Sequence, residues 1–186
     1  EDFTWGGRLN AETLTLNDAP AMAWADAAVA ELAALPTVRL LPRTTVLGAF
    51  DHGVYGALER TADHLPVPEA NKPRQVLWRI YSRRAVLCAG ATERPIAFPN
   101  NDRPGIMTVS AVATYLHRYG VCPGWRVVIF TNNDSAYRTA LDLKAAGRDV
   151  AAVVDVRCKP SSALVDAARQ AGIRIYDRSA IIRARV

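Results

Sequence analysis

The residues in this sequence best placed to do chemistry lie between Trp125 and Arg157, where a carboxylate follows an apolar run. Asp155 comes directly after Val150 to Val154, about 20 residues beyond a polar turn at Thr131 to Asp134. In a Rossmann unit, an acidic residue at this distance from the turn holds a ribose hydroxyl of a bound dinucleotide. Asp155 is therefore a candidate cofactor-binding residue.

The turn itself departs from the G-x-G-x-x-G pattern that brings backbone close to a pyrophosphate. Its three fingerprint positions hold Thr131, Asn133 and Ala136, and only Ala136 keeps the residue type that close packing needs. Asn tolerates left-handed backbone angles, so the turn can form, but its side chain fills space that a phosphate needs. We also expect the Asp134 carboxylate to cap the following helix. The turn therefore predicts a Rossmann shape without a tightly bound dinucleotide, and weak binding through Asp155 stays open.

A strand, a helix and a second strand must position these residues. The apolar run Val127 to Phe130 predicts the first strand. Small or apolar residues then share one helical stripe, which indicates a helix packed closely on a sheet: Ala136, Ala140 and Leu143. Gly147 suits a left-handed helix C-cap. A helix of about 13 residues spans about 20 Å, so the chain can return to form a parallel second strand by a right-handed crossover.

A second group of candidate ligands lies in the first half of the chain. Glu1 precedes a Gly6-Gly7 pair, and in flavoproteins with two dinucleotide-binding domains a strand ending in an acidic residue leads to such a turn beneath the ribose and pyrophosphate. An ordinary glycine turn is the alternative interpretation. The run Arg84 to Gly90 predicts a buried parallel strand, whose end would bring Ala89 to Ala91 to the sheet edge where ligands bind.

The remaining patterns give an α/β chain with antiparallel strands in its first half. Apolar periodicity and turn residues predict two helices, Pro20 to Leu35 and Ser110 to Tyr119, and four strands, Val38 to Leu41, Thr44 to Phe50, Val54 to Thr61 and Val76 to Tyr81. Prolines and Gly105 interrupt the chain after the predicted strand at Arg84 to Gly90. We therefore expect a domain boundary near Arg103 to Gly105, which separates residues 1–104 from residues 105–186.

Composition excludes several classes of protein. The 186 residues are 50% apolar but contain no 18-residue apolar run and no signal-peptide pattern, so we expect no membrane span and no export signal. Because the sequence begins without Met, a removed or missing N-terminal segment stays open. The net charge of +5 is spread along the chain without a basic run, which favours a solvated surface over nucleic-acid binding.

Cysteine and histidine spacing gives no metal site. Cys88, Cys122 and Cys158 have neither metal-ligand nor CxxC spacing, so we expect buried or free thiols in a reducing, cytoplasmic compartment. His52 and His64 have no third ligand at metal spacing, and we expect no metal.

Three long motifs together carry a family likeness. LPRTTVLGAFDHGVYGALER (Leu41 to Arg60), VLCAGATERPIAFPNNDRPGIM (Val86 to Met107) and RVVIFTNNDSAYRTALDLKAAG (Arg126 to Gly147) resemble the α subunit of heterotetrameric sarcosine oxidase. Opine oxidase and hydrogen cyanide synthase subunits are similar, more distantly. The resemblance implies a thioredoxin-reductase-like pair of dinucleotide-binding domains, present here as a fragment. The family's first strand with its glycine-rich turn and its folate-binding part have no counterpart in this sequence.

The resemblance also implies an activity. Such complexes hold FAD, FMN and NAD and oxidise the small amine sarcosine to glycine, passing the one-carbon unit to folate and the electrons to oxygen. The amine is oxidised on a flavin carried largely by a partner subunit, so the resemblance assigns no catalytic residue to this chain. The first domain is expected to bind NAD or FAD, whereas FMN, folate and the other subunits belong to the full complex.

The same resemblance places residues beside the cofactor of the first domain. They are Gly6, Gly7 and Arg8, Thr45 and Val46 on the adenine side, and Ala89, Gly90 and Ala91. Glu1 is the ribose candidate, and a slip of one residue would give that role to Asp2. The rival hypothesis is a non-catalytic nucleotide-binding scaffold subunit of a related amine or opine oxidase or dehydrogenase complex. The degenerate turn at Thr131 favours this rival for the second domain.

Overall fold

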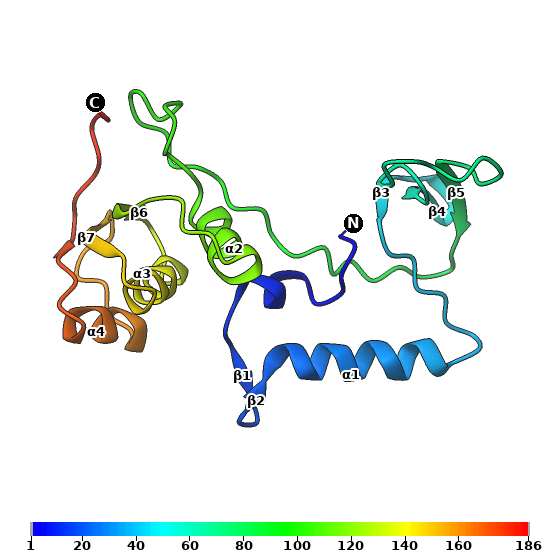
Figure 1. Ribbon diagram of the computed structural model, residues 1–186, viewed down its shortest axis with the longest axis horizontal. Coiled ribbons are helices and arrows are strands. Elements are labelled where there is room, and N and C mark those ends of the chain that lie inside the picture. The colour runs from blue at the N-terminus through cyan, green and yellow to red at the C-terminus, as the bar shows by residue number, and fades with distance from the viewer. Residues whose placement is uncertain (1, 186) are drawn as a thin grey trace. The chain divides into compact units, whose positions relative to one another are not determined.

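A computed structural model of the chain describes residues 2–185 and divides the chain into two compact units, Glu1–Gly90 and Ala91–Val186 (Figure 1). The division falls before the boundary expected near Arg103 to Gly105. The reason is that the segment after Gly90 packs on the second unit. Phe98 in this segment lies edge-on to Phe130, with ring centroids 6.0 Å apart.

The first unit contains a three-stranded antiparallel sheet of order β3-β4-β5. Its elements are η1 (Gly7–Ala11), β1 (Thr15–Leu16), β2 (Ala19–Pro20), α1 (Ala21–Ala34), β3 (Thr44–Phe50), η2 (Asp51–Gly53), β4 (Val54–Arg60) and β5 (Gln75–Tyr81). The helix and the three longer strands agree with the sequence prediction. The turn between β3 and β4 requires glycine at Gly53, whose φ is 72° and where a Cβ would lie 2.3 Å from the Ser82 carbonyl oxygen.

Two predicted strands of this unit are absent. Val38 to Leu41 forms no strand, and neither does Arg84 to Gly90. The second segment was expected to be buried, yet the exposed fractions of Val86 and Leu87 are 87% and 92%. A parallel strand needs neighbours that pair with its N–H and C=O groups and cover both of its faces. Within the described residues no strand lies beside Arg84 to Gly90, so the prediction of a buried strand is wrong for this chain.

The second unit is a parallel three-stranded sheet of order β6-β7-β8 with its crossover helices. Its elements are α2 (Val109–Tyr119), β6 (Arg126–Thr131), α3 (Ser135–Ala145), β7 (Asp149–Asp155), α4 (Ala163–Gln170) and β8 (Ile175–Tyr176). The helix α3 joins β6 to β7, and α4 joins β7 to β8 (Figure 1). The predicted strand–helix–strand unit and the α/β fold class are thus confirmed.

The core of the second unit lies under α3. Ala136, Ala140 and Leu143 have exposed fractions of 2%, 0% and 0%, as the small-residue stripe predicted. The helix ends at Gly147, with φ of 75°, where Gly147 N donates to Lys144 O and Arg148 N to Leu143 O. These two bonds form a Schellman cap, which satisfies the last free carbonyls of the helix.

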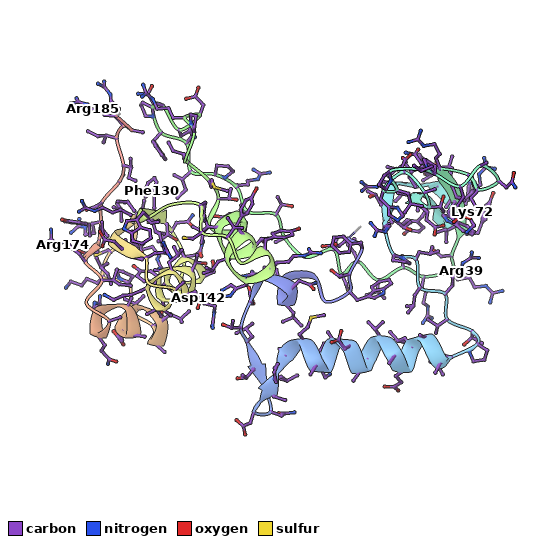
Figure 2. All side chains as sticks on the ribbon, in the orientation of Figure 1. Arg39, Lys72, Phe130, Asp142, Arg174 and Arg185 are labelled. Carbon is purple, nitrogen blue, oxygen red and sulfur yellow. The ribbon has the colours of Figure 1, made fainter. Side chains whose placement is uncertain are left out.

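A polar contact also ties α2 to α3 in this unit. His117 Nε2 lies 2.8 Å from Oδ2 of Asp142, which is labelled on α3 in Figure 2. His117 therefore helps to pack one helix on the other.

None of the helices that the structure describes is both long and apolar enough to cross a membrane.

Candidate functional site

The carboxylate of Asp155 lies at the end of β7, where the sequence predicted a ribose ligand, but its side chain is fully buried. Its oxygens accept hydrogen bonds from other groups of the same chain. Tyr137 Oη donates to Oδ2 over 2.8 Å, and the backbone N–H of Arg157 donates to Oδ1 over 2.9 Å. The Arg157 guanidinium donates to both oxygens, with Nε 3.1 Å from Oδ1 and Nη2 2.8 Å from Oδ2. Asp155 is thus held from within the unit.

This environment fixes the charge on each group. Burial raises the pKa of Asp155, but hydrogen bonds from Arg157 and Tyr137 outweigh burial and hold that pKa below its ordinary value of 3.8. Burial and the hydrogen bond to Asp155 raise the pKa of Tyr137 above its ordinary value of 10.0. The hydrogen bond to Asp155 raises the pKa of Arg157. At neutral pH, a protonated phenol and a guanidinium cation therefore donate to a carboxylate anion.

Arg157 also reaches the turn that precedes α3. Its Nη2 lies 2.8 Å from Oδ1 of Asp134, and the side chains of Arg157 and Asp134 are 33% and 39% exposed. That Asp134 oxygen has no well-aligned hydrogen-bond donor, so the contact is an ion pair rather than a directional hydrogen bond. One guanidinium thus joins the turn after β6 to the end of β7.

The expected helix cap at Asp134 is wrong. Asp134 is the N-cap residue by position, but its side chain accepts no capping hydrogen bond. Asn133 does this instead, because its Oδ1 accepts from Ser135 N over 3.0 Å and from Ser135 Oγ over 2.6 Å. The reason is that the Asp134 carboxylate turns toward the cation of Arg157, and a charged partner is favoured over a neutral N–H.

Side chains close the turn where a dinucleotide fingerprint has glycine. Thr131 Oγ1 accepts from Asn133 N over 3.1 Å and donates to Asn133 O over 3.0 Å. The N–H groups of Asn133 and Ser135 are therefore already bonded within the turn. In a phosphate-binding turn such groups point at the ligand.

In the first unit, the glycine pair forms a tight turn next to α1. Gly6 and Gly7 have φ of 105° and 53°, conformations that favour glycine. A Cβ on Gly6 would lie 2.7 Å from Sδ of Met22, whereas one on Gly7 would meet nothing within 4 Å. Both positions therefore favour glycine through their backbone conformation, and at Gly6 an added Cβ would also require the flexible Met22 side chain to shift. Glu1, the predicted ribose ligand, lies outside the described residues.

The other predicted cofactor-binding residues lie in separate segments of the chain. Arg8 is exposed and its Nε donates to Oε1 of Glu12 over 2.7 Å. Thr45 and Val46 lie in β3, and Ala89 to Ala91 are exposed outside any strand.

The N-terminal segment lies beside the start of β3, where the guanidinium of Arg43 is 5.1 Å from the ring of Phe3. The carbonyl of Asp2 accepts from the backbone N–H of Arg43 over 2.9 Å, which places this segment beside the start of the strand. A cavity of about 140 Å³ lies there, lined by Asp2, Phe3, Arg43, Arg60 and His64. Ligand pockets usually have about 300–1,000 Å³, so this cavity alone does not hold a dinucleotide.

Sequence reasoning missed Tyr137 and Arg157. Both carried a signal. Tyr137 adjoins Ala136 on the inward side of a helix, and a buried tyrosine hydroxyl needs a polar partner. Arg157 lies two residues after Asp155 and so on the same side of an extended chain. Their common partner could not be identified without the packing of α3 on β7.

Most of the chain is similar in sequence to three curated proteins that share one name. It is 45% identical over 152 residues to sarcosine oxidase subunit alpha of Rhizobium meliloti (strain 1021), which covers 82% of this chain and 15% of that protein. It is 47% identical over 163 residues to the subunit of the same name from Corynebacterium sp. (strain P-1), covering 87% and 17%. The subunit from Corynebacterium sp. (strain U-96) is 42% identical over 145 residues, covering 77% and 15%. No protein-family model matches the chain.

A solved structure shares the fold. L-proline dehydrogenase from P. horikoshii matches with a TM-score of 0.62 and 21% identity, over 83% of this chain and 28% of that one. This likeness concerns the fold alone. The chain spans 15% to 17% of the length of the curated relatives, whose names denote one subunit of a larger assembly. The similarity confirms what the three long motifs predicted: the chain is related to a segment of the sarcosine oxidase alpha subunit.

Proposed function

We propose that this chain is part of the dinucleotide-binding alpha subunit of a multi-subunit flavin oxidoreductase that oxidises sarcosine to glycine with oxygen as acceptor. The main support is sequence identity of 42% to 47% with three sarcosine oxidase alpha subunits over 77% to 87% of the chain. The reaction belongs to oxidoreductases that act on CH–NH donors. We assign the reaction to the complete assembly, because the chain spans only 15% to 17% of the length of each relative.

The chain's own role in this proposal is cofactor binding by the first unit. NAD or FAD would lie over the Gly7 backbone, where a Cβ would meet no atom within 4 Å outside the two neighbouring residues. The cofactor-proximal residues of this unit are Gly6, Gly7, Arg8, Thr45, Val46, Ala89 and Gly90, with Glu1 beyond the described residues, and the predicted residue Ala91 follows directly as the first residue of the second unit. The bound dinucleotide would supply redox chemistry or a structural anchor. The site would be completed by parts of the subunit that the longer relatives have.

No residue of this chain is proposed as a catalyst. FMN, folate and the amine would bind elsewhere in the complex, in parts that the longer relatives have. The alternative, a non-catalytic scaffold subunit of an amine or opine oxidase or dehydrogenase complex, is not favoured because all three curated relatives are sarcosine oxidase subunits.

The test uses the complete subunit produced with its partner subunits. Sarcosine should give peroxide and a flavin absorbance spectrum should be present. Gly7→Ala should lower the amount of bound NAD or FAD, while Gly105→Ala should leave it unchanged. These glycines are matched, because both have positive φ, 53° and 90°, and a Cβ on either meets nothing within 4 Å. A complex with full flavin content that makes no peroxide from sarcosine would contradict the proposed reaction.

A further inference from the structure

We propose that Arg157 takes the place of a dinucleotide in the second unit, because it bridges the carboxylate at the start of α3 to the carboxylate at the end of β7. In a nucleotide-binding Rossmann unit, the ligand makes this connection: its pyrophosphate lies at the helix N-terminus and its ribose at the strand-end acid. Here the side chains of one chain make it, with Arg157 Nη2 2.8 Å from both Asp134 Oδ1 and Asp155 Oδ2.

The strand-end acid has no free capacity for a ribose hydroxyl. Asp155 has an exposed fraction of 0%, and Tyr137 beneath it also has 0%. A ribose would have to displace Arg157 or Tyr137 from a buried carboxylate. Displacing either would leave a buried charge with fewer donors, which is unfavourable.

The helix start is equally unsuited to a phosphate. Asp134 places a negative side chain where a pyrophosphate would lie, and like charges repel. Thr131 and Asn133 bond the N–H groups of the turn, as described above. The residues present therefore do not fit a dinucleotide at this position.

Backbone contacts cover the same strand end. Ser179 N donates to the carbonyl of Asp155 over 3.1 Å, and Arg178 N donates to the carbonyl of Arg157 over 2.9 Å. The chain after β8 thus runs along the residues that would face a ribose. The bond from Arg178 thus fixes the backbone of Arg157.

Arg157 could instead be read as a ligand for the 2′-phosphate of NADP, and its contacts speak against this role. An arginine near the strand-end acid can accommodate the 2′-phosphate of NADP in Rossmann units. In this unit the guanidinium is already shared between two carboxylates, and its side chain is only 33% exposed. A 2′-phosphate would have to compete with both carboxylates for one cation.

Binding is tested on the whole 186-residue chain with NADH and NADPH as probes, followed by NMR. The amide signals of Asn133, Ser135 and Arg157 report on this position, whereas those of Gly6 and Gly7 report on the first unit. We expect no saturable shift of the first group up to millimolar ligand. A saturable shift there below millimolar NADH or NADPH would overturn the proposal. Shifts confined to Gly6 and Gly7 would concern only the proposed function of the first unit.

The bridge is tested by two pairs of variants. Arg157→Ala should lower the melting temperature by several degrees, because it leaves a buried carboxylate without its cation. Arg126→Ala removes an arginine that is 75% exposed and paired with Asp149 at 3.1 Å, and should change the melting temperature little.

If Arg157→Ala does not fold, Asp134→Asn examines the bridge without removing the partner of Asp155. It should shift the amide signals at Ser135 and at Arg157 together, whereas Asp166→Asn should shift neither. The proposal would be overturned if Arg157→Ala lowered the melting temperature no more than its control, or if Asp134→Asn shifted these amide signals no more than Asp166→Asn.

Discussion

The hydrogen bond from Tyr137 to Asp155 gives the sharpest stability prediction. Tyr137→Phe removes one hydroxyl group and leaves the ring, which is fully buried, in place. The lost bond is 2.8 Å long and ends on a carboxylate that is charged at neutral pH. Hydrogen bonds to charged groups contribute about 1.5–3 kcal/mol to stability. Because Arg157 still donates to both oxygens of Asp155, we expect a loss near the lower end of this range.

Such a loss is measurable by thermal or denaturant unfolding. About 1 kcal/mol shifts the melting temperature by about 4–8 °C in a domain of 60–100 residues, which is the size range of the second unit. Trp125 is the one tryptophan in this unit, and Arg148 lies over its ring at 4.2 Å, so its fluorescence reports on unfolding there once Trp5, Trp24 and Trp78 of the first unit are replaced by phenylalanine. The transition observed at Trp125 should therefore move to a lower temperature.

The control removes an exposed hydroxyl from the same unit. Tyr115 is 43% exposed on α2, and Tyr115→Phe should change the free energy of unfolding by less than about 0.5 kcal/mol. If Tyr137→Phe also stays within about 0.5 kcal/mol of the unsubstituted chain, the reasoning about a buried, charge-assisted bond is refuted.

Four further predictions concern pH, association and activity. The lowered pKa of Asp155 stabilises the fold above its ordinary value of 3.8, so this contribution should fade as pH falls below 3.8, and Asp155→Asn should flatten that part of a stability–pH curve. The raised pKa of Tyr137 acts in the opposite direction: its contribution is present below 10.0 and fades above it. Tyr137 should therefore keep its proton at about pH 11, so in an ultraviolet titration Tyr137→Phe should not lower the phenolate absorbance that the native chain reaches at that pH. Apolar side chains such as Leu77 and Leu87, which are 71% and 92% exposed, should cause self-association at high concentration in analytical ultracentrifugation, and a monodisperse monomer would count against this. The isolated chain should produce no peroxide from sarcosine above a no-protein control, because a flavin reaction needs a complete pocket around the isoalloxazine ring.

Local patterns were sufficient to predict the strand–helix–strand part of the second unit, whereas α4 and β8 were not predicted. The strand β6, the helix α3 and the strand β7 follow from hydrophobic periodicity, and Gly147 ends the helix as predicted. These signals depend on neighbours a few residues apart, which a sequence displays directly. The parallel pairing then follows because a crossover helix can return the chain only in one direction.

Sequence patterns were not sufficient to predict structure that depends on partners far away in the chain. The run Arg84 to Gly90 has the composition of a buried strand, but strand formation also needs a neighbour, and within the described residues the chain provides none there. The sequence patterns that predict a strand report on the segment and not on the rest of the sheet.

The candidate site shows why residue type and spacing locate a position without giving its role. Asp155 stands where a Rossmann unit has its ribose acid, and the structure confirms that it ends β7. Its role is decided by Tyr137, 18 residues earlier in the chain, and by Arg157, which also holds Asp134. At an exposed strand end the same carboxylate would be open to a hydroxyl ligand. Buried and held by two donor side chains, it stabilises the unit instead, so the number of donors already bonded to the acid separates a binding site from a structural one.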